Sequence, residues 1–460
     1  MRRHGGTGGG SAVPWVWSGR RRLMLRTLVR SPAVDVQFVP PPSLAPVTDI
    51  RRSLREALAH PLEAPRLSEL ARGARSVAIA VPDSSRAVPV EAIVPALVEE
   101  LAAGGVAASQ VTVIVGCGAH RATTLEERRR LAGGPAVTAF GVRLSDAQAQ
   151  TPPHRTLGRT RLGCPICLSE DVATADLAVS VGIVEPHLYA GFSGGVKGVA
   201  IGCAAEDTIA WTHAPTFISR PGVELLMLAD NPFQDTLREI AAVTSLRYAV
   251  NAAGADTGAV SRVAAGHPVA VQTALARHLT PACLHEVERP FDVVVAGIPA
   301  PKHESLYQAS RAATYIGLGA HPPVRDGGLI VLCAGLPGGF GDGPGERRFA
   351  ELLAGSTPDE LVARGSRGSL GPGGQRAFVV SRVLQRCRLA VAGAADPDVF
   401  SEVGIGAFSN IDDALDAALP ATSDGASPSR VLVIADALSS VVRLRRQPGG
   451  PPGTALRVRG

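Results

Sequence analysis

The sequence predicts an α/β protein of two domains, each with a mostly parallel sheet flanked by helices, and an active site in the cleft between the domains. Three observations support this prediction. The chain has 460 residues, enough for two or three domains. Short apolar runs alternate with segments of helical periodicity. Polar residues and glycines follow the apolar runs, at the positions where open α/β sheets bind ligands.

The first half of the chain shows this alternation in order. Apolar and β-branched runs predict buried strands at 76–81, 111–115 and 177–184. Apolar residues at helical spacing predict helices at 89–103, 125–131 and 231–243. Because strand, loop and helix repeat, the strands should run parallel with helices on the faces of the sheet. We expect this cofactor-binding domain to span residues 33–283.

The second half repeats the pattern, and we expect this domain to span residues 284–446. Strands are predicted at 291–297, 328–333 and 430–435. Helices are predicted at 307–316, 346–353 and 377–385. Residues 267–287 read as a connector between the domains.

Both ends of the chain are expected to lie outside the domains. Residues 1–32 lack the apolar core of a signal peptide and predict a disordered leader, or a start called too early with Met24 as the true start. Residues 447–460 are rich in glycine and proline and predict a loose tail.

Composition excludes several classes of partner and site. The net charge of +5 comes from dispersed arginines, which argues against nucleic acid, and no apolar run is long enough to span a membrane. Seven mostly scattered cysteines favour a reducing cytoplasm. Cys164 and Cys167 form a CxxC pair without a second pair, so a zinc site is not supported.

Lysine is rare in this sequence. Lys197 and Lys302 are the only two lysines among 46 basic residues. Where arginine serves as the general cation, a remaining lysine is a candidate for chemistry that needs an amine, such as nucleophilic attack or a covalent link. Lys197 is the stronger candidate because it follows a predicted strand and a glycine-rich stretch, AGFSGGVKG.

Three histidines stand near predicted strand ends or near this lysine. His120 follows the second strand, and His187 and His213 flank Lys197. Imidazole can bind a metal or transfer protons near pH 7, although each histidine alone would more often be structural. Their spacing does not fit an HExxH zinc site.

Two further polar groups are candidates for binding anions. Asp83, Ser85 and Arg86 follow the first strand, where they could hold a phosphate or simply cap a helix. Gln308 and Arg311 are three residues apart and share a helix face, which suits a joint grip on a carboxylate or an ordinary surface helix.

In combination, these residues resemble the nickel-pincer nucleotide-dependent lactate racemase family. The resemblance covers most of the chain, from about residue 76 to 386. The order of PH, AGFSGG, lysine and a later histidine is matched between residues 186 and 213. Upstream, a GxHRxxT pattern contains His120 and a DxSR pattern starts at Asp83. Downstream, a YQxxR pattern starts at Tyr307.

The resemblance implies a racemase or epimerase of a 2-hydroxy acid. The implied cofactor is a pyridinium-3-thioamide-5-thiocarboxylic acid mononucleotide that grips nickel, is made by separate biosynthesis proteins and is joined to Lys197. His213 would be the protein's nickel ligand, and His120 and His187 would be acid/base catalysts during hydride transfer between C2 and the cofactor. The resemblance further implies cofactor binding by Asp83, Ser85, Arg86, Ser193, Gly194 and Gly195. Substrate binding would fall to Arg86, Tyr307, Gln308 and Arg311.

The sequence departs from the family's usual pattern at several positions. Arg311 stands where lactate-acting members have lysine, Arg376 where an aromatic residue is expected, and Val196 where arginine is common. No proline follows Arg86. Arginine offers a wider, bidentate grip, which indicates a larger or more acidic substrate than lactate. The alternatives are a nucleotide-dependent 2-hydroxy acid oxidoreductase, disfavoured by the missing GxGxxG turn, and a non-catalytic carrier of the nickel cofactor.

Overall fold

The computed structural model describes most of the chain and contains the predicted α/β architecture. The described residues are 13–30, 34–139, 141–254, 259–319, 321–368, 370–371, 373–419 and 428–445. The expected loose tail, 447–460, lies outside them, as do residues 1–12 of the expected leader. Among the described residues no helix is long and apolar enough to cross a membrane.

The first sheet has six strands, and all neighbouring pairs run parallel except the pair at one edge, β12 with β13. Its central strands are apolar and buried on both faces, as a parallel sheet requires. In spatial order they are β13 (Val260–Gly266), β12 (Leu246–Gly254), β9 (Leu177–Val184), β4 (Val77–Pro82), β5 (Val111–Gly118) and β6 (Arg143–Gln148).

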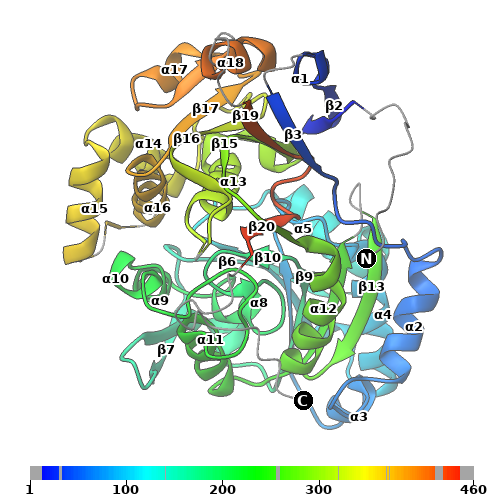
Figure 1. Ribbon diagram of the computed structural model, residues 1–460. Helices are drawn as coiled ribbons and strands as arrows, with labels where there is room; N and C mark the ends of the chain where they lie inside the picture. Colours follow the sequence, from blue (N-terminus) through cyan, green and yellow to red (C-terminus); the bar gives the residue numbers. More distant parts are fainter. Residues whose placement is uncertain are drawn as a thin grey trace.

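Helices cover both faces of this sheet (Figure 1). On one face α4 (Val90–Ala103) buries Ile93 and Leu97 against the strands, together with Leu54 and Leu58 of α2 (Ile50–Ala59). On the other face, Val199 of α8 (Lys197–Ala200) and Leu237 of α11 (Pro232–Ala242) join the core that contains Ala80 of β4. These layers confirm the predicted parallel sheet with helices on its faces.

The second sheet has eight strands, which are parallel apart from a hairpin at one edge. Figure 1 shows it above the first sheet. Its main path is β18 (Gly406–Phe408), β17 (Arg388–Ala392), β16 (Val324–Cys333), β15 (Phe291–Pro299), β1 (Trp15–Gly19) and β2 (Arg21–Met24). Strand β19 (Ser429–Ile434) pairs with both β15 and β3 (Val34–Val39).

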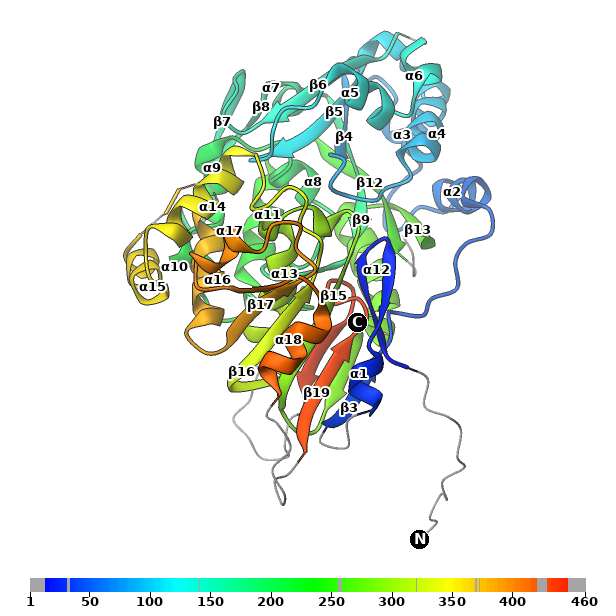
Figure 2. The same cartoon turned by 90° about the horizontal axis from the view of Figure 1, so that it is seen from above.

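The first described residues are ordered, which corrects the expectation of a disordered leader over 1–32. Strands β1 and β2 form a hairpin on β15, and α1 (Arg26–Arg30) follows. Val16 and Leu25 are fully buried in the core of the second sheet. Figure 2 shows this N-terminal segment beside β19. The short segment lacks internal periodicity, and its order comes from partners about 280 and 400 residues away in the chain.

The expected first domain, residues 33–283, therefore does not coincide with the first sheet. Strand β3 falls within 33–283 but pairs with β19 of the second sheet. The segment 267–287 is also more regular than the expected connector. It consists of α12 (Pro268–Cys283), which packs beside β12, and β14 (Leu284–Val287), which pairs with β20 (Val441–Leu444).

Candidate active site

The candidate residues of the first half converge at one edge of the first sheet. Strands β5, β4 and β9 are neighbours and parallel, so their carboxyl ends lie side by side. Asp83 follows β4, His120 follows β5 and His187 follows β9. The predicted loops after these strand ends are thus brought together by the order of the strands.

Asp83 and His120 form a contact pair. Nδ1 of His120 lies 2.5 Å from Oδ2 of Asp83, while the amide and hydroxyl of Ser85 donate to Oδ1 of Asp83 at 3.0 and 2.6 Å. Burial alone would raise the pKa of Asp83, but the hydrogen bond and charge of His120 hold it well below its usual value. In the neutral tautomer of His120 the carboxylate keeps the proton on Nδ1, so Nε2 is the nitrogen that can accept a proton.

The loop that carries His187 is fastened by buried amide side chains. Nδ2 of Asn231 donates to the carbonyl of Tyr189 at 2.8 Å, and Nε2 of Gln234 donates to the carbonyl of Ala190 at 2.7 Å. Gly191 has a φ of +70°, and a Cβ there would lie 1.9 Å from the carbonyl oxygen of Met227. Only glycine fits this turn.

His187 itself accepts hydrogen bonds at Nδ1. The amides of Tyr189 and Ala190 donate to this nitrogen at 3.3 and 3.2 Å. In the neutral ring the proton therefore sits on Nε2. Burial, followed by the positive charge of Lys197, lowers the pKa of His187 well below its usual value.

The predicted cofactor residues Ser193, Gly194 and Gly195 already have partners within the protein. The Ser193 hydroxyl donates to the carbonyl of Ile183 at 2.7 Å, and the Gly195 amide donates to Oδ1 of Asn251 at 2.7 Å. Both glycines have positive φ, +80° and +58°. In this structure the segment sets the path of the chain into α8, and Asn251 is a residue that sequence reasoning missed.

Lys197 begins α8, next to several cations. Burial, followed by the charges of Arg86 and Arg311, lowers the pKa of Lys197 to about 7. Near neutral pH a substantial share of its side chain is thus an uncharged amine, the form that acts as a nucleophile.

His213 follows α9 (Glu206–Thr212) and keeps one ring nitrogen free. Its Nδ1 lies 3.1 Å from the carbonyl oxygen of Ile209, which can only accept, so Nδ1 carries the proton. Burial, followed by the charge of Lys197, lowers the pKa of His213 to about 3. A neutral imidazole with an unprotonated Nε2 is the form that binds a metal.

The predicted anion-binding residues come from both halves of the chain. Arg86 forms an ion pair with Glu185, within the first half. Gln308 and Arg311 lie on α13 (Leu306–Gly317), with Oε1 of Gln308 and Nε of Arg311 buried and unpartnered. The Tyr315 hydroxyl donates to the carbonyl of Pro186 at 2.9 Å and so joins α13 to the His187 loop.

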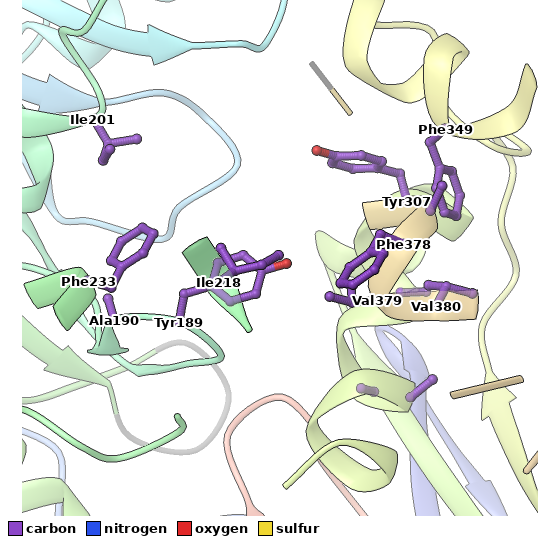
Figure 3. Packing of buried hydrophobic residues seen from close by; sticks show 14 of the residues in the cluster. Tyr189, Ala190, Ile201, Ile218, Phe233, Tyr307, Phe349, Phe378, Val379 and Val380 are labelled. Carbon is purple, nitrogen blue, oxygen red and sulfur yellow. The ribbon is translucent and has the colours of Figure 1, made fainter. Parts of the chain in front are cut away.

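A pocket of about 410 Å³ is lined by residues of both halves. Its lining includes Asp83, Ser85, His120, Tyr307 and Gln308, whereas His187, Lys197 and His213 do not line it. Figure 3 shows Tyr307 and Tyr189 pointing from opposite sides into the space between the two halves.

Lys302 also lines the pocket and was given little weight in the sequence. Its Nζ donates to the carbonyl of Ser85 at 2.7 Å, and burial lowers its pKa well below the usual value. The scarcity of lysine in the sequence, which pointed to Lys197, applies equally to Lys302. Arg376, noted in the sequence only as a departure, is also buried near this region.

No cluster of metal ligands supplements His213. In the part of the chain that the structure describes, no group of three or more histidine, cysteine, aspartate or glutamate side chains could hold a metal ion. Cys164 and Cys167 are free thiols, the first buried and the second half-buried.

Comparisons with known proteins find related sequences and a similar fold. Residues 26–225 match the family model of the lactate racemase N-terminal domain. The lactate racemase of Thermoanaerobacterium thermosaccharolyticum is 24% identical over 393 residues, covering 85% of this chain and 90% of that protein. The lactate racemase of Lactiplantibacillus plantarum is 25% identical over 410 residues, covering 85% and 91%. The apoprotein structure of the T. thermosaccharolyticum enzyme matches with a TM-score of 0.80 at 22% identity, covering 94% of this chain and 100% of that one, which confirms the fold.

Proposed function

Because this chain is similar to lactate racemases over most of its length, we propose that it racemises or epimerises a 2-hydroxy acid with a nickel-pincer nucleotide linked to Lys197. It is an isomerase, as its relatives are. The observation that carries the finer proposal is the grouping of one amine and two imidazoles, Lys197, His187 and His213, each with a pKa lowered first by burial.

The residues present fit the proposed cofactor. Lys197 offers an amine that can condense with a thiocarboxylate, because its pKa of about 7 leaves much of it uncharged. His213 offers Nε2 as a nickel ligand, with Nδ1–H fixed on the carbonyl of Ile209. When bound, the cofactor would accept hydride from C2 of the substrate and return it to either face.

His120 is suited to remove the hydroxyl proton of the substrate. With Nδ1 held by Asp83, its Nε2 would accept the proton, and the carboxylate would stabilise the imidazolium that forms. His120 and Asp83 also line the pocket, where a small acid can reach them. We assign Asp83 to positioning His120 rather than to direct contact with the cofactor.

His187 would contact the hydroxyl oxygen of the substrate from a different side than His120. In the observed arrangement it presents Nε2–H and would donate a hydrogen bond to the substrate oxygen. To accept a proton at Nε2, the ring must first release its contacts with the amides of Tyr189 and Ala190. Racemisation needs proton handling on both faces of the substrate, which two histidines can supply.

The substrate carboxylate would be bound from the second half of the chain. Arg311 has a buried, unpartnered Nε, and Gln308 lies one helical turn before it. Arg86 is less available because Glu185 already forms an ion pair with it. Tyr307 and Gln308 line the pocket and would place the acid against His120.

The proposal is tested by producing the chain together with a cofactor-making pathway. We expect bound nickel by elemental analysis and a covalent adduct by intact mass. Lys197→Ala should lose the adduct, while Lys302→Arg, the matched change at the other lysine, should keep it. An unmodified mass without nickel would contradict the proposal. Loaded protein that turns over no 2-hydroxy acid would instead identify a carrier.

A further inference from the structure

Arg376 is a buried cation without an acidic partner. It lies in the first turn of α16 (Gly374–Leu384) and is 7% exposed. Its Nε and Nη1 atoms are buried and have no hydrogen-bond partner. Among the described residues, no carboxylate forms an ion pair with it. Its Cζ lies 5.6 Å from the ring centroid of Tyr307, a residue that lines the pocket.

Arg311, on the helix that also carries Tyr307, is a second buried guanidinium without an acidic partner. Nε of Arg311 is buried without a partner, and no described carboxylate pairs with this residue either. The charge of Arg376 is the first cause after burial that lowers the pKa of Arg311.

A buried guanidinium without an acidic partner is unfavourable unless an anion approaches it. Arg86 differs from Arg311 and Arg376, because it forms an ion pair with Glu185 of the same chain. One substrate carboxylate satisfies one of the two free guanidinium groups. A second negative group is needed for the other.

We propose that the substrate is a 2-hydroxy dicarboxylic acid, with Arg311 binding the carboxylate next to the reacting carbon and Arg376 binding the distal carboxylate. This proposal rests on the racemase function proposed above and narrows its substrate class. In it, Tyr307, which lines the pocket, supports the guanidinium of Arg376 through its ring face.

The test uses the holoenzyme and compares 2-hydroxybutanedioate with lactate and 2-hydroxybutanoate, following racemisation by chiral chromatography. We expect kcat/KM to be roughly 100-fold higher for the dicarboxylate, the effect of one charge-assisted interaction. Arg376→Gln should remove that preference by lowering kcat/KM for the dicarboxylate. Arg382→Gln is the matched control, since Arg382 lies on the same helix with its Cζ 5.9 Å from the ring of Phe378.

The outcomes separate this proposal from the racemase proposal itself. A parent enzyme that prefers a monocarboxylate overturns the dicarboxylate proposal and leaves the racemase intact, whether or not any variant folds. Loss of adduct or nickel in a folded Arg376→Gln variant also overturns it, because the partner of Arg376 would then be an anion of the cofactor. Loaded enzyme inactive on all three acids overturns the dicarboxylate proposal, and inactivity on a wider panel of 2-hydroxy acids overturns the racemase function.

Discussion

Asp83 holds His120 at a distance of 2.5 Å between Oδ2 and Nδ1, and so joins the carboxyl ends of β4 and β5. The sequence placed Asp83 among residues that bind the cofactor. The structure points its carboxylate at an imidazole instead and adds two hydrogen bonds from Ser85. This pairing determines which nitrogen of His120 can accept a proton.

We predict that Asp83→Asn keeps the cofactor and loses most of the activity. The amide cannot hold the same tautomer or stabilise the imidazolium, so kcat should fall about 100-fold, within the ~10²–10⁴ range for general base catalysis. Nickel content, adduct mass and kcat should be measured on the same preparation. Loss of the adduct would instead indicate that Asp83 binds the cofactor.

The Asp83 pair should also contribute to stability in a defined pH range. The folded-state pKa of Asp83 lies below the unfolded value near 3.8, so the unfolded chain takes up this proton first. The stabilisation is present above pH 3.8 and is lost as pH falls below it. Urea unfolding between pH 6 and pH 3 should show a smaller loss in Asp83→Asn than in the parent, and equal losses would contradict the assignment.

Lys197 is predicted to react as an amine near neutral pH. Its pKa of about 7 implies that acylation by a lysine-selective ester rises with a midpoint near pH 7, whereas an ordinary lysine titrates near 10.5. The apoprotein should be labelled over pH 5–10 and the modified residue followed by peptide mass spectrometry. Lys197→Ala serves as the control for assigning the signal, and a midpoint near pH 10 would refute the prediction.

His213→Ala should lose nickel but keep the organic part of the cofactor attached to the protein. Removing Nε2 takes away the proposed nickel ligand but leaves the proposed covalent link to Lys197 unaltered. We expect nickel content to fall while the adduct mass remains. His154→Ala, at a half-buried histidine on β7 (His154–Arg159), should change neither. Full nickel occupancy without His213 would exclude it as the ligand.

Asn231 is predicted to stabilise the His187 loop strongly. It is fully buried, caps α11 and donates to the carbonyls of Tyr189 and Met227. Asn231→Ala leaves these carbonyls without donors, and we expect a loss of about 2–4 kcal/mol in the free energy of unfolding. Asn410→Ala removes an exposed cap of α18 (Ile411–Ala418) and should cost about 1 kcal/mol. Equal losses in urea unfolding would contradict the buried role.

Local sequence determined much of the regular structure and the identity of the candidate residues. The runs at 111–115 and 177–184 are apolar enough to be buried whatever surrounds them, and β5 and β9 contain them. The helix predicted at 125–131 matches α5 (Leu125–Leu131) because Thr124 and Glu127 form a capping box. The scarcity of lysine pointed to Lys197 before any contact was known.

Only the tertiary structure decided which partners these residues have. The pairing of β1 and β3 with strands some 280 and 400 residues away cannot be read from short segments, because it depends on contacts rather than on local propensity. The same holds for Asp83 with His120, for Lys302 with Ser85, and for Asn231 beneath the His187 loop. A pKa or a tautomer depends on burial and neighbouring charge, and those exist only once the chain has folded.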